Sequence, residues 1–418
     1  MFHYNFITFV ENCIMVELFE NSNLLINNID LTLKRSKFEN IDWDGRLVEI
    51  NGSRGVGKTT MLLQQAKLIN AGANNSILYA SLDDPYFYKS DLILVADEFL
   101  KNGGTYLFLD EVHRYPSKYP EHDWSSELKT IYDRFPQLKV IYSGSSILKL
   151  RKAKGDLSRR RISYNLPGLS FREYLYFNGI ANFERISLED ILIRHTEISN
   201  QIISKIKVIP HFKAYIKTGY YPFYNEAPGH YFERLKDVIT MILESDIPAV
   251  TDIPFGTSVK LKKLLSMISE SAPYTPNLSL ISKELFIKDQ RTLLKYFSFL
   301  ENAELIRGLS KDAKGNQILR KPNKVFLDNT NLPYCFSATP NTGTLRETFF
   351  ANQVANKHVL TFPDKGDFKV DETRVFEIGG KNKPKAQLKN VPDAYFALDD
   401  IETGFGNTIP LWLFGFLY

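Results

Sequence analysis

The feature that most constrains this chain is the segment Gly52–Thr59, which fits the pattern G-x-x-x-x-G-K-[S/T] at every fixed position. Glycines at this spacing let backbone N–H groups turn inward and form a nest for an anion. A helix that begins at Gly57 adds the positive end of its dipole at the same point. Lys58 then reaches the β- and γ-phosphates, and the Thr59 hydroxyl ligates Mg²⁺. The pattern therefore predicts a phosphate-binding loop (P-loop, Walker A) for ATP. The predicted nucleotide contacts are Gly52, Ser53, Arg54, Gly55, Val56, Gly57, Lys58, Thr59 and Thr60.

Short apolar runs alternate with helical periodicity in the region around this loop. Between the first two runs, apolar residues such as Leu62 and Ala66 recur at helical spacing. Each run is flanked by turn residues, as expected for strands of a parallel sheet that is buried on both faces. Strand–helix alternation predicts an α/β sandwich of the P-loop NTPase type. The four predicted strands are 47–50, 76–80, 106–109 and 139–142.

The third run, Tyr106–Leu109, ends in two carboxylates, Asp110 and Glu111. A buried strand delivers both acids to the carboxyl edge of the sheet, where open α/β sheets bind their ligands. Asp110 is expected to hold Mg²⁺ through water, as the Walker B acid does. Glu111 is expected to orient and deprotonate the attacking water. The adjacent glutamate favours a hydrolase over a small-molecule kinase, which does not need it.

The fourth run ends in small hydroxyl residues, Ser143-Gly144-Ser145-Ser146. Such a position can place a polar side chain between the second acid and the γ-phosphate. Ser143 is the preferred candidate for this role, ahead of Ser145. Ordinary turn chemistry is the alternative explanation.

A basic stretch follows at residues 151–161, with six cations and one acid. It can be a solvated surface, which is common for charge runs. It can also carry an arginine finger that neutralises charge across a subunit boundary of a homo-oligomer, with Arg159 and Arg160 as the candidates. Contact with nucleic-acid phosphates is the third alternative.

The composition says little about binding partners, but the cysteine content indicates a cellular compartment. Lys+Arg number 52 and Asp+Glu 48, so a net charge of +4 permits nucleic-acid binding without arguing for it. Cys13 and Cys335 form neither a disulfide framework nor a zinc spacing, which fits a reducing cytoplasm. No apolar stretch reaches the ~18 residues of a membrane span. The apolar N-terminus lacks a basic region, so a signal peptide is not expected; Met15 is an alternative start to Met1.

Beyond the predicted sandwich, the pattern changes twice. Residues 166–255 are helical and charged, and from about 257 two helical stripes enclose a shorter helix near 282–286. A hairpin signal follows at 313–316. Three helices followed by a hairpin is the order of a winged helix, and the last part of the chain is rich in strands.

Four segments in this order resemble a large prokaryotic family of AAA-type ATPases: Gly52–Thr60, Leu109–His113, Ser143–Ser146 and Leu166–Tyr174. The resemblance implies that the ATPase is joined to a helical region, a winged helix and a small α/β domain of the PD-(D/E)xK nuclease-like fold. The expected domains are 1–165, 166–256, 257–335 and 336–418.

The winged helix has two interpretations. In a DNA-binding winged helix the third helix enters the major groove; in other proteins the module only packs between domains. The cations and amide that would meet DNA are Lys288, Gln290, Arg291 and Lys295 on the helix side and Lys311, Lys314, Arg320 and Lys321 on the wing.

The resemblance maps Glu347, Asp367 and Glu377 onto the acidic positions of the nuclease-like fold. Asp367 and Glu377 could share a second metal ion. The lysine expected two residues after Glu377 is Gly379, although Lys381 or Lys383 could occupy the space. The nuclease centre is therefore either active or degenerate. The seven histidines show no ligand spacing.

The leading hypothesis is an Mg²⁺-dependent AAA-type ATPase whose nucleotide state is coupled to the winged helix and C-terminal domain, with DNA or a protein as partner. One alternative is a nucleotide-dependent switch with slow turnover. Another is a metal-dependent nuclease gated by ATP.

Overall fold

The computed structural model describes residues 16–70, 76–116, 123–147, 156–251, 253–271, 273–311 and 321–418. The chain forms two compact units: the first holds the residues up to Leu166 together with Ala249–Thr251, and the second holds the rest. Met1, Cys13, Met15, the basic residues 151–155, the hairpin signal at 313–316, Lys314 and Arg320 lie outside the described residues. Within the described part of the chain, no helix is long and apolar enough to cross a membrane.

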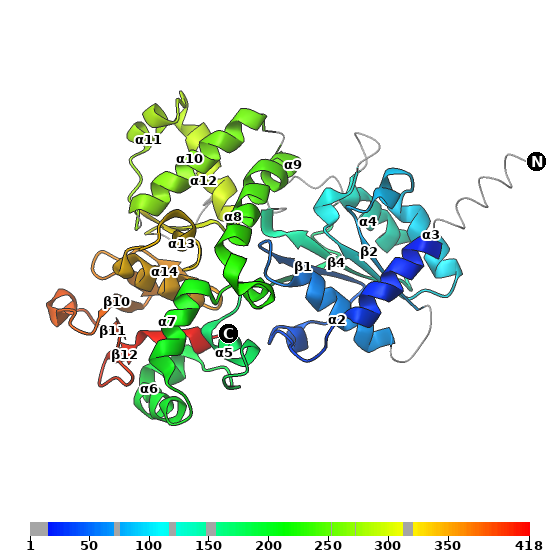
Figure 1. The fold of residues 1–418 in the computed structure, drawn as a ribbon. Helices are drawn as coiled ribbons and strands as arrows, with labels where there is room; N and C mark the ends of the chain where they lie inside the picture. The colour runs from blue at the N-terminus through cyan, green and yellow to red at the C-terminus, as the bar shows by residue number, and fades with distance from the viewer. Residues whose placement is uncertain are drawn as a thin grey trace, which may run out of the picture. The chain divides into compact units, whose positions relative to one another are not determined.

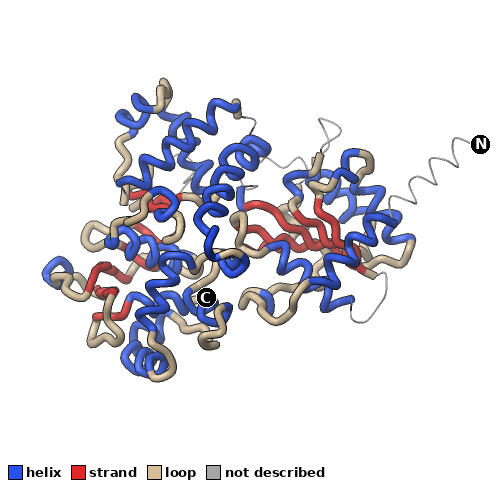
Figure 2. Tube along the Cα trace, viewed as in Figure 1, coloured by secondary structure: helices blue, strands red, loops and turns tan. Residues whose placement is uncertain are grey.

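The N-terminal unit is built on a parallel sheet of five strands in the order β2-β3-β4-β1-β5 (Figures 1 and 2). The predicted parallel α/β sheet is confirmed, and the P-loop NTPase fold with it. The strands are β1 (Leu47–Gly52), β2 (Ile77–Ser81), β3 (Tyr106–Asp110), β4 (Lys139–Ser145) and β5 (Ile162–Asn165). The helices are α2 (Lys58–Asn70), α3 (Leu92–Lys101) and α4 (Trp124–Arg134).

The edge strand β5 was not among the strands predicted from sequence. Its four residues are largely exposed, so they lack the apolar run that marks the other strands. Pairing with β1 alone places it at the sheet edge. A further helix over residues 16–28 precedes the sheet, within the predicted N-terminal arm. Ser22 of that helix accepts a hydrogen bond from the Tyr79 amide at 2.9 Å, which ties the arm to β2.

The strand order determines which strand ends and loops are neighbours at the carboxyl edge of this sheet. β4 pairs with β1 on one side and with β3 on the other. All three strands are parallel, so they end at the same edge. The loop after β1, the acids at the end of β3 and the hydroxyls at the end of β4 therefore converge.

The second unit starts with helices and ends with a mixed sheet. Its helices are α5 (Phe171–Phe177), α6 (Leu188–Ile203), α7 (Val208–Thr218), α8 (Tyr231–Met241), α10 (Phe255–Ser271), α11 (Leu278–Glu284), α12 (Gln290–Asn302), α13 (Pro333–Phe336) and α14 (Thr342–Ala355). The short helix α9 (Ile247–Thr251) lies between α8 and α10 in the chain, and its residues Ala249–Thr251 group with the first unit. The antiparallel pair β6 (Ile306–Leu309) and β7 (Lys324–Leu327) follows α12, so three helices precede a two-stranded ribbon. The mixed sheet has the order β12-β11-β10-β9-β8. Its strands are β8 (Leu360–Thr361), β9 (Phe368–Val370), β10 (Arg374–Gly380), β11 (Ala394–Asp399) and β12 (Thr408–Pro410).

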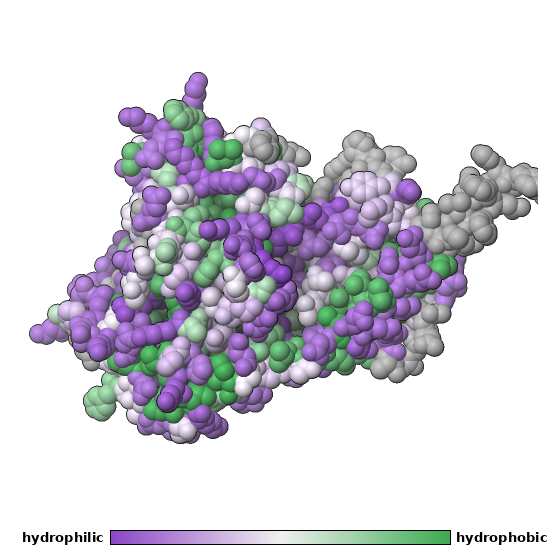
Figure 3. Space-filling model, viewed as in Figure 1, coloured by the Kyte–Doolittle hydropathy of each residue, from purple (hydrophilic) through white to green (hydrophobic). Residues whose placement is uncertain are grey.

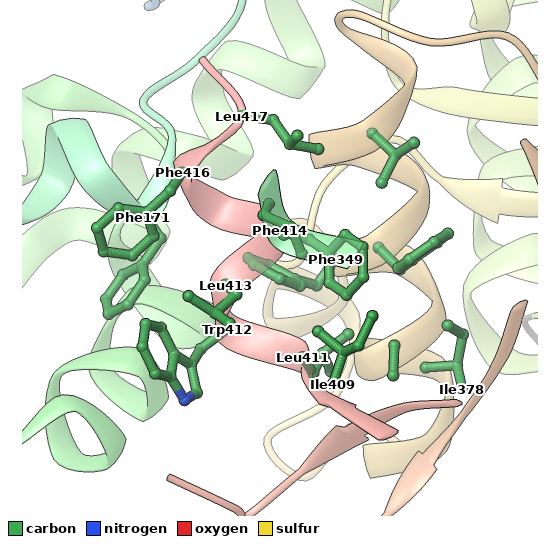
Figure 4. Packing of buried hydrophobic residues seen from close by; sticks show 14 of the residues in the cluster. Phe171, Phe349, Ile378, Ile409, Leu411, Trp412, Leu413, Phe414, Phe416 and Leu417 are labelled. Carbon is green, nitrogen blue, oxygen red and sulfur yellow. The ribbon is translucent and has the colours of Figure 1, made fainter. Parts of the chain in front are cut away.

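The core of this second unit is completed by the last residues of the chain. The 3₁₀ segment Leu411–Phe416 is buried along its whole length. In Figure 4, Phe416 faces Phe171, while Phe414 lies on the side of Phe349. Segments far apart in sequence therefore share one hydrophobic cluster.

Candidate nucleotide-binding site

The loop after β1 has the backbone that a phosphate nest requires. Gly55 and Gly57 have φ values of 87° and 95°, in the left-handed region that glycine adopts at little cost. Gly52 leaves no room for a side chain, because a Cβ there would lie 2.3 Å from the Leu166 carbonyl oxygen. The structure therefore explains why glycine is needed at positions 52, 55 and 57.

Lys58 lies inside this loop and is 5 % exposed. Its Nζ donates hydrogen bonds of 2.9 Å to the carbonyl oxygens of Gly52 and Ser53. Its ammonium is thus held at the centre of the nest by backbone oxygens. The guanidinium of Arg35, from the arm, donates to the Val56 carbonyl at 2.8 Å and supports the loop from outside.

The loop and the acid strand meet directly. The Thr59 hydroxyl donates a hydrogen bond of 2.6 Å to Oδ2 of Asp110, and both belong to the predicted magnesium site. Asp110 is 2 % exposed, so its carboxylate depends on these internal donors. Thr59 and Asp110 lie far apart in sequence and were both predicted to hold Mg²⁺, and the structure brings them into contact.

Two further hydroxyls hold the Asp110 carboxylate. Ser143 from β4 donates to Oδ1, and Tyr79 from β2 donates to Oδ2 at 2.9 Å. Burial, together with the charge of Asp110, raises the pKa of Tyr79 well above its usual value, so the phenol stays protonated and remains a donor. Tyr79 was missed by the sequence analysis, because a tyrosine within an apolar strand carries no signal of its own.

Glu111 leaves the strand in the left-handed conformation, with φ of 52°. Its amide donates to the Ser143 hydroxyl at 3.1 Å, so Ser143 touches both acids of the pair. The Glu111 carboxylate lies 3.3 Å from His113 Nε2 and 3.9 Å from both Arg54 and Arg114. The second acid therefore faces a cation of the loop itself.

The two arginine-finger candidates differ in their surroundings. Arg160 donates to both carboxylate oxygens of Asp133, at 2.9 and 3.0 Å. The Arg159 side chain is 86 % exposed and lies 3.8 Å from Asp156. Neighbouring Arg161 is held by the buried Glu49 at 3.4 Å. Nothing within one chain tests a role across a subunit boundary, so the finger stays a prediction.

In the second unit the predicted acids of the nuclease-like fold are close to two lysines. Lys324 on β7 lies 3.6 Å from Glu347 and 3.7 Å from Asp367. Lys383 lies 2.7 Å from Oε1 of Glu377. Burial, reinforced by the charge of Asp367, raises the pKa of Glu347 to about 7. The sequence analysis did not single out Lys324, which comes from a strand outside the mixed sheet.

Gly379 explains how Lys383 reaches Glu377. A Cβ at position 379 would lie 2.7 Å from Cβ and Cγ of Lys383, so the lysine stem occupies the space of the missing side chain. Lys381, the other lysine considered from sequence, is exposed. In the described residues, no group of three or more His, Cys, Asp and Glu side chains is arranged to hold a metal ion. The second metal site at Asp367 and Glu377 therefore stays a prediction.

Fold and loop together give the N-terminal unit the P-loop NTPase fold. A family model described as an AAA domain matches residues 44–175. A second model, a domain of unknown function named DUF8612, matches residues 209–339. Its span includes α10 to α12 and the β6–β7 ribbon.

An uncharacterized protein of Methanocaldococcus jannaschii, MJ1637, is 25 % identical over 315 residues, which cover 72 % of this chain. The chain spans 63 % of the length of that relative. The Walker-type ATPase of Pyrococcus abyssi is a similar solved structure, with 13 % identity, a TM-score of 0.41 and coverage of 75 % of this chain and 99 % of its own. ORC1 of Aeropyrum pernix, solved in complex with DNA, has 12 % identity, a TM-score of 0.30 and coverage of 72 % and 89 %.

Proposed function

We propose that the N-terminal unit binds ATP with Mg²⁺ and hydrolyses it. The observation that carries this proposal is the 2.6 Å hydrogen bond between Thr59 and Asp110. It joins the predicted phosphate loop to the predicted magnesium acid, which come from two different strands. The match of residues 44–175 to an AAA domain supports the same activity.

The residues present suit a magnesium–triphosphate ligand. The Lys58 ammonium, now held by two carbonyl oxygens, would exchange them for β- and γ-phosphate oxygens. Thr59 and Asp110 would hold Mg²⁺, Asp110 through water. When bound, Mg²⁺ supplies positive charge that neutralises the phosphates during transfer.

Glu111 would accept the proton of the attacking water at its carboxylate. Proton removal raises the nucleophilicity of the water oxygen toward the γ-phosphorus. Ser143 would keep the two acids in register, because its hydroxyl donates to Asp110 and accepts from the Glu111 amide. Arg159 has the more exposed side chain of the two finger candidates, so we would test it first for a role in a homo-oligomer.

The direct test of the proposal is to measure nucleotide binding and phosphate release by the purified chain, with and without Mg²⁺. Both are repeated with duplex DNA at stated salt concentrations, because phosphate contacts weaken as salt rises. Steady release without a partner supports an ATPase. Tight binding with release that rises only on adding DNA or a protein partner favours the switch with slow turnover. Absence of nucleotide binding would contradict both.

Tyr79→Phe should weaken the response to Mg²⁺ while leaving the site otherwise intact. The variant removes the 2.9 Å hydrogen bond to Asp110 and keeps the buried ring. A hydrogen bond to a charged group contributes ~1.5–3 kcal/mol, so the Mg²⁺ concentration for half-maximal hydrolysis should rise ~10-fold or more. Saturating Mg²⁺ should restore the rate.

Tyr106→Phe is the matched control for this variant. Tyr106 is also a strand tyrosine, and it donates to a carboxylate, Asp44, at 2.7 Å, but at the opposite end of β3. An equal shift of the Mg²⁺ response in both variants would show that the effect is not specific to the site.

A second candidate function is nucleotide-gated cleavage of nucleic acid by the C-terminal sheet. The observation that favours it is the position of Lys383, whose stem lies over Gly379 and whose ammonium contacts Glu377. The lysine missing from the motif is thereby replaced in space by one from further along the chain. Three acids, Glu347, Asp367 and Glu377, are then paired with two lysines in one cluster.

Cleavage of plasmid and single-stranded DNA under Mg²⁺ or Mn²⁺ tests this candidate. Lys383→Met should abolish cleavage, whereas Lys381→Met, at the exposed lysine nearby, should not. Glu377→Ala should also abolish it. No cleavage by the unaltered chain under either metal would leave the acid–lysine cluster with a structural role only.

A further inference from the structure

The turn between α11 and α12 exposes a large aromatic side chain. Phe286 is 85 % exposed, whereas its neighbours Leu285 and Ile287 are 2 % and 8 % exposed. Its φ is 51°, a backbone conformation that bulky residues rarely adopt. The turn therefore directs Phe286 outward while the residues on both sides fill the core.

Several cations lie on the segments that flank this turn. Lys260 and Lys263 on α10 reach the turn, donating to the carbonyl oxygens of Phe286 at 3.4 Å and Glu284 at 3.0 Å. Four more cations are exposed on α11, on the turn and on α12: Lys283, Lys288, Arg291 and Lys295. In Figure 3, hydrophilic side chains with interspersed hydrophobic ones cover the region of α10 and α11 at the upper left.

Few acidic side chains lie close enough to neutralise the charge of these cations. Within the described part of the chain, none of the four on α11, the turn and α12 forms an ion pair. Three acids lie on these segments: Glu284 and Asp289 beside the turn, and Glu301 at the far end of α12. Asp289 is used as the cap of α12, where it accepts from the Arg291 amide at 3.0 Å. The surface thus combines positive charge that forms no ion pairs with the projecting Phe286 ring and the half-exposed Leu280.

Nucleic acid has the chemistry that matches both features. Its phosphates meet the cations, and an unpaired base offers a flat face on which an aromatic side chain stacks. An acidic protein segment would satisfy the charge but give the ring no specific partner. An anionic membrane would match the charge and the exposed apolar side chains Phe286 and Leu280 (50 % exposed), but it offers no flat partner for the ring, and the vesicle arm of the test separates the two.

We infer that the α11–α12 turn is a nucleic-acid contact in which Phe286 stacks on an unpaired base and Lys283, Lys288 and Arg291 meet phosphates. This surface lies in the second unit, and the inference does not depend on ATP hydrolysis. It places the contact at the turn before α12 and predicts a preference for single strands over duplex.

The test is fluorescence anisotropy of the full chain with a labelled single-stranded oligonucleotide and the matched duplex over a series of salt concentrations. Phe286→Ala should weaken single-strand binding ~10-fold, because stacking contributes ~1–3 kcal/mol per base, with an unchanged salt slope. The double variant Lys288→Ala/Arg291→Ala should instead lower the slope of log K against log salt by ~1.4, about 0.7 for each lost phosphate contact.

Phe405→Ala is the matched control, since Phe405 is 88 % exposed on a different turn, between Gly404 and Gly406. It should bind like the unaltered chain. Equal binding of Phe286→Ala and the unaltered chain would overturn the inference, as would an equal loss for single strand and duplex. Binding to vesicles of phosphatidylserine and phosphatidylcholine without binding to the oligonucleotide would also overturn it.

Discussion

Glu111→Gln should keep nucleotide binding and lose hydrolysis. The substitution preserves the length of the side chain but removes the group that accepts a proton. General base catalysis contributes ~10²–10⁴-fold, so the rate of phosphate release should fall at least ~10²-fold. The two arginine guanidinium groups that face the carboxylate lie 3.9 Å away, and their side chains are partly exposed, so little folding stability depends on its charge. Single-turnover phosphate release measures the rate, and fluorescent-nucleotide titration measures the affinity.

Asp110→Asn gives the contrasting variant. Asp110 accepts from Thr59, Tyr79 and Ser143, so its loss should weaken magnesium-dependent binding as well as hydrolysis. Full activity of Glu111→Gln would place the base on another residue. If Glu111→Gln instead lost binding to the same degree as Asp110→Asn, the two acids would not have separate roles.

Lys58→Ala should abolish nucleotide binding at micromolar concentrations. The ammonium is buried in the loop and lies within 2.9 Å of two backbone oxygens, at the point where phosphate oxygens are expected. Each charge-assisted hydrogen bond contributes ~1.5–3 kcal/mol, so losing two would weaken affinity at least ~10²-fold. Isothermal titration with ATP and Mg²⁺ measures the loss.

The control for this variant must separate binding from folding. Lys101→Ala removes an exposed lysine on α3 that pairs with Asp97, and it should bind ATP normally. Circular dichroism should show unchanged helix content for both variants. Unchanged ATP affinity in Lys58→Ala would refute the assignment of the phosphate loop, even if the fold remained intact.

The parts of the site that could be predicted from sequence are those that depend on local order. The glycine spacing of the loop and the strand that ends in Asp110 and Glu111 are local patterns, and the structure brings them together. β5 was missed because an exposed edge strand has no apolar run. Its place beside β1 depends on pairing with a segment more than a hundred residues earlier.

The remaining features depend on pairings that no local pattern encodes. Tyr79 reaches Asp110 only because β2 lies beside β3. Lys324 approaches Glu347 from a ribbon that precedes the mixed sheet. Lys383 was one of two candidates from sequence, and the absence of a side chain at Gly379 decides between them. Such contacts follow from tertiary packing, so the spacing of residues in the sequence does not predict them.

The buried segment Leu411–Phe416 bears on how the second unit is made during translation. Its partner Phe171 leaves the ribosome some 240 residues earlier than Phe416. Until the late segment emerges, Phe171 lacks its contact with Phe416 and the cluster is incomplete, which leaves apolar surface open to aggregation or to a chaperone. The five strands of the first unit all lie before Leu166, so that sheet is complete in sequence long before the late segment is synthesised.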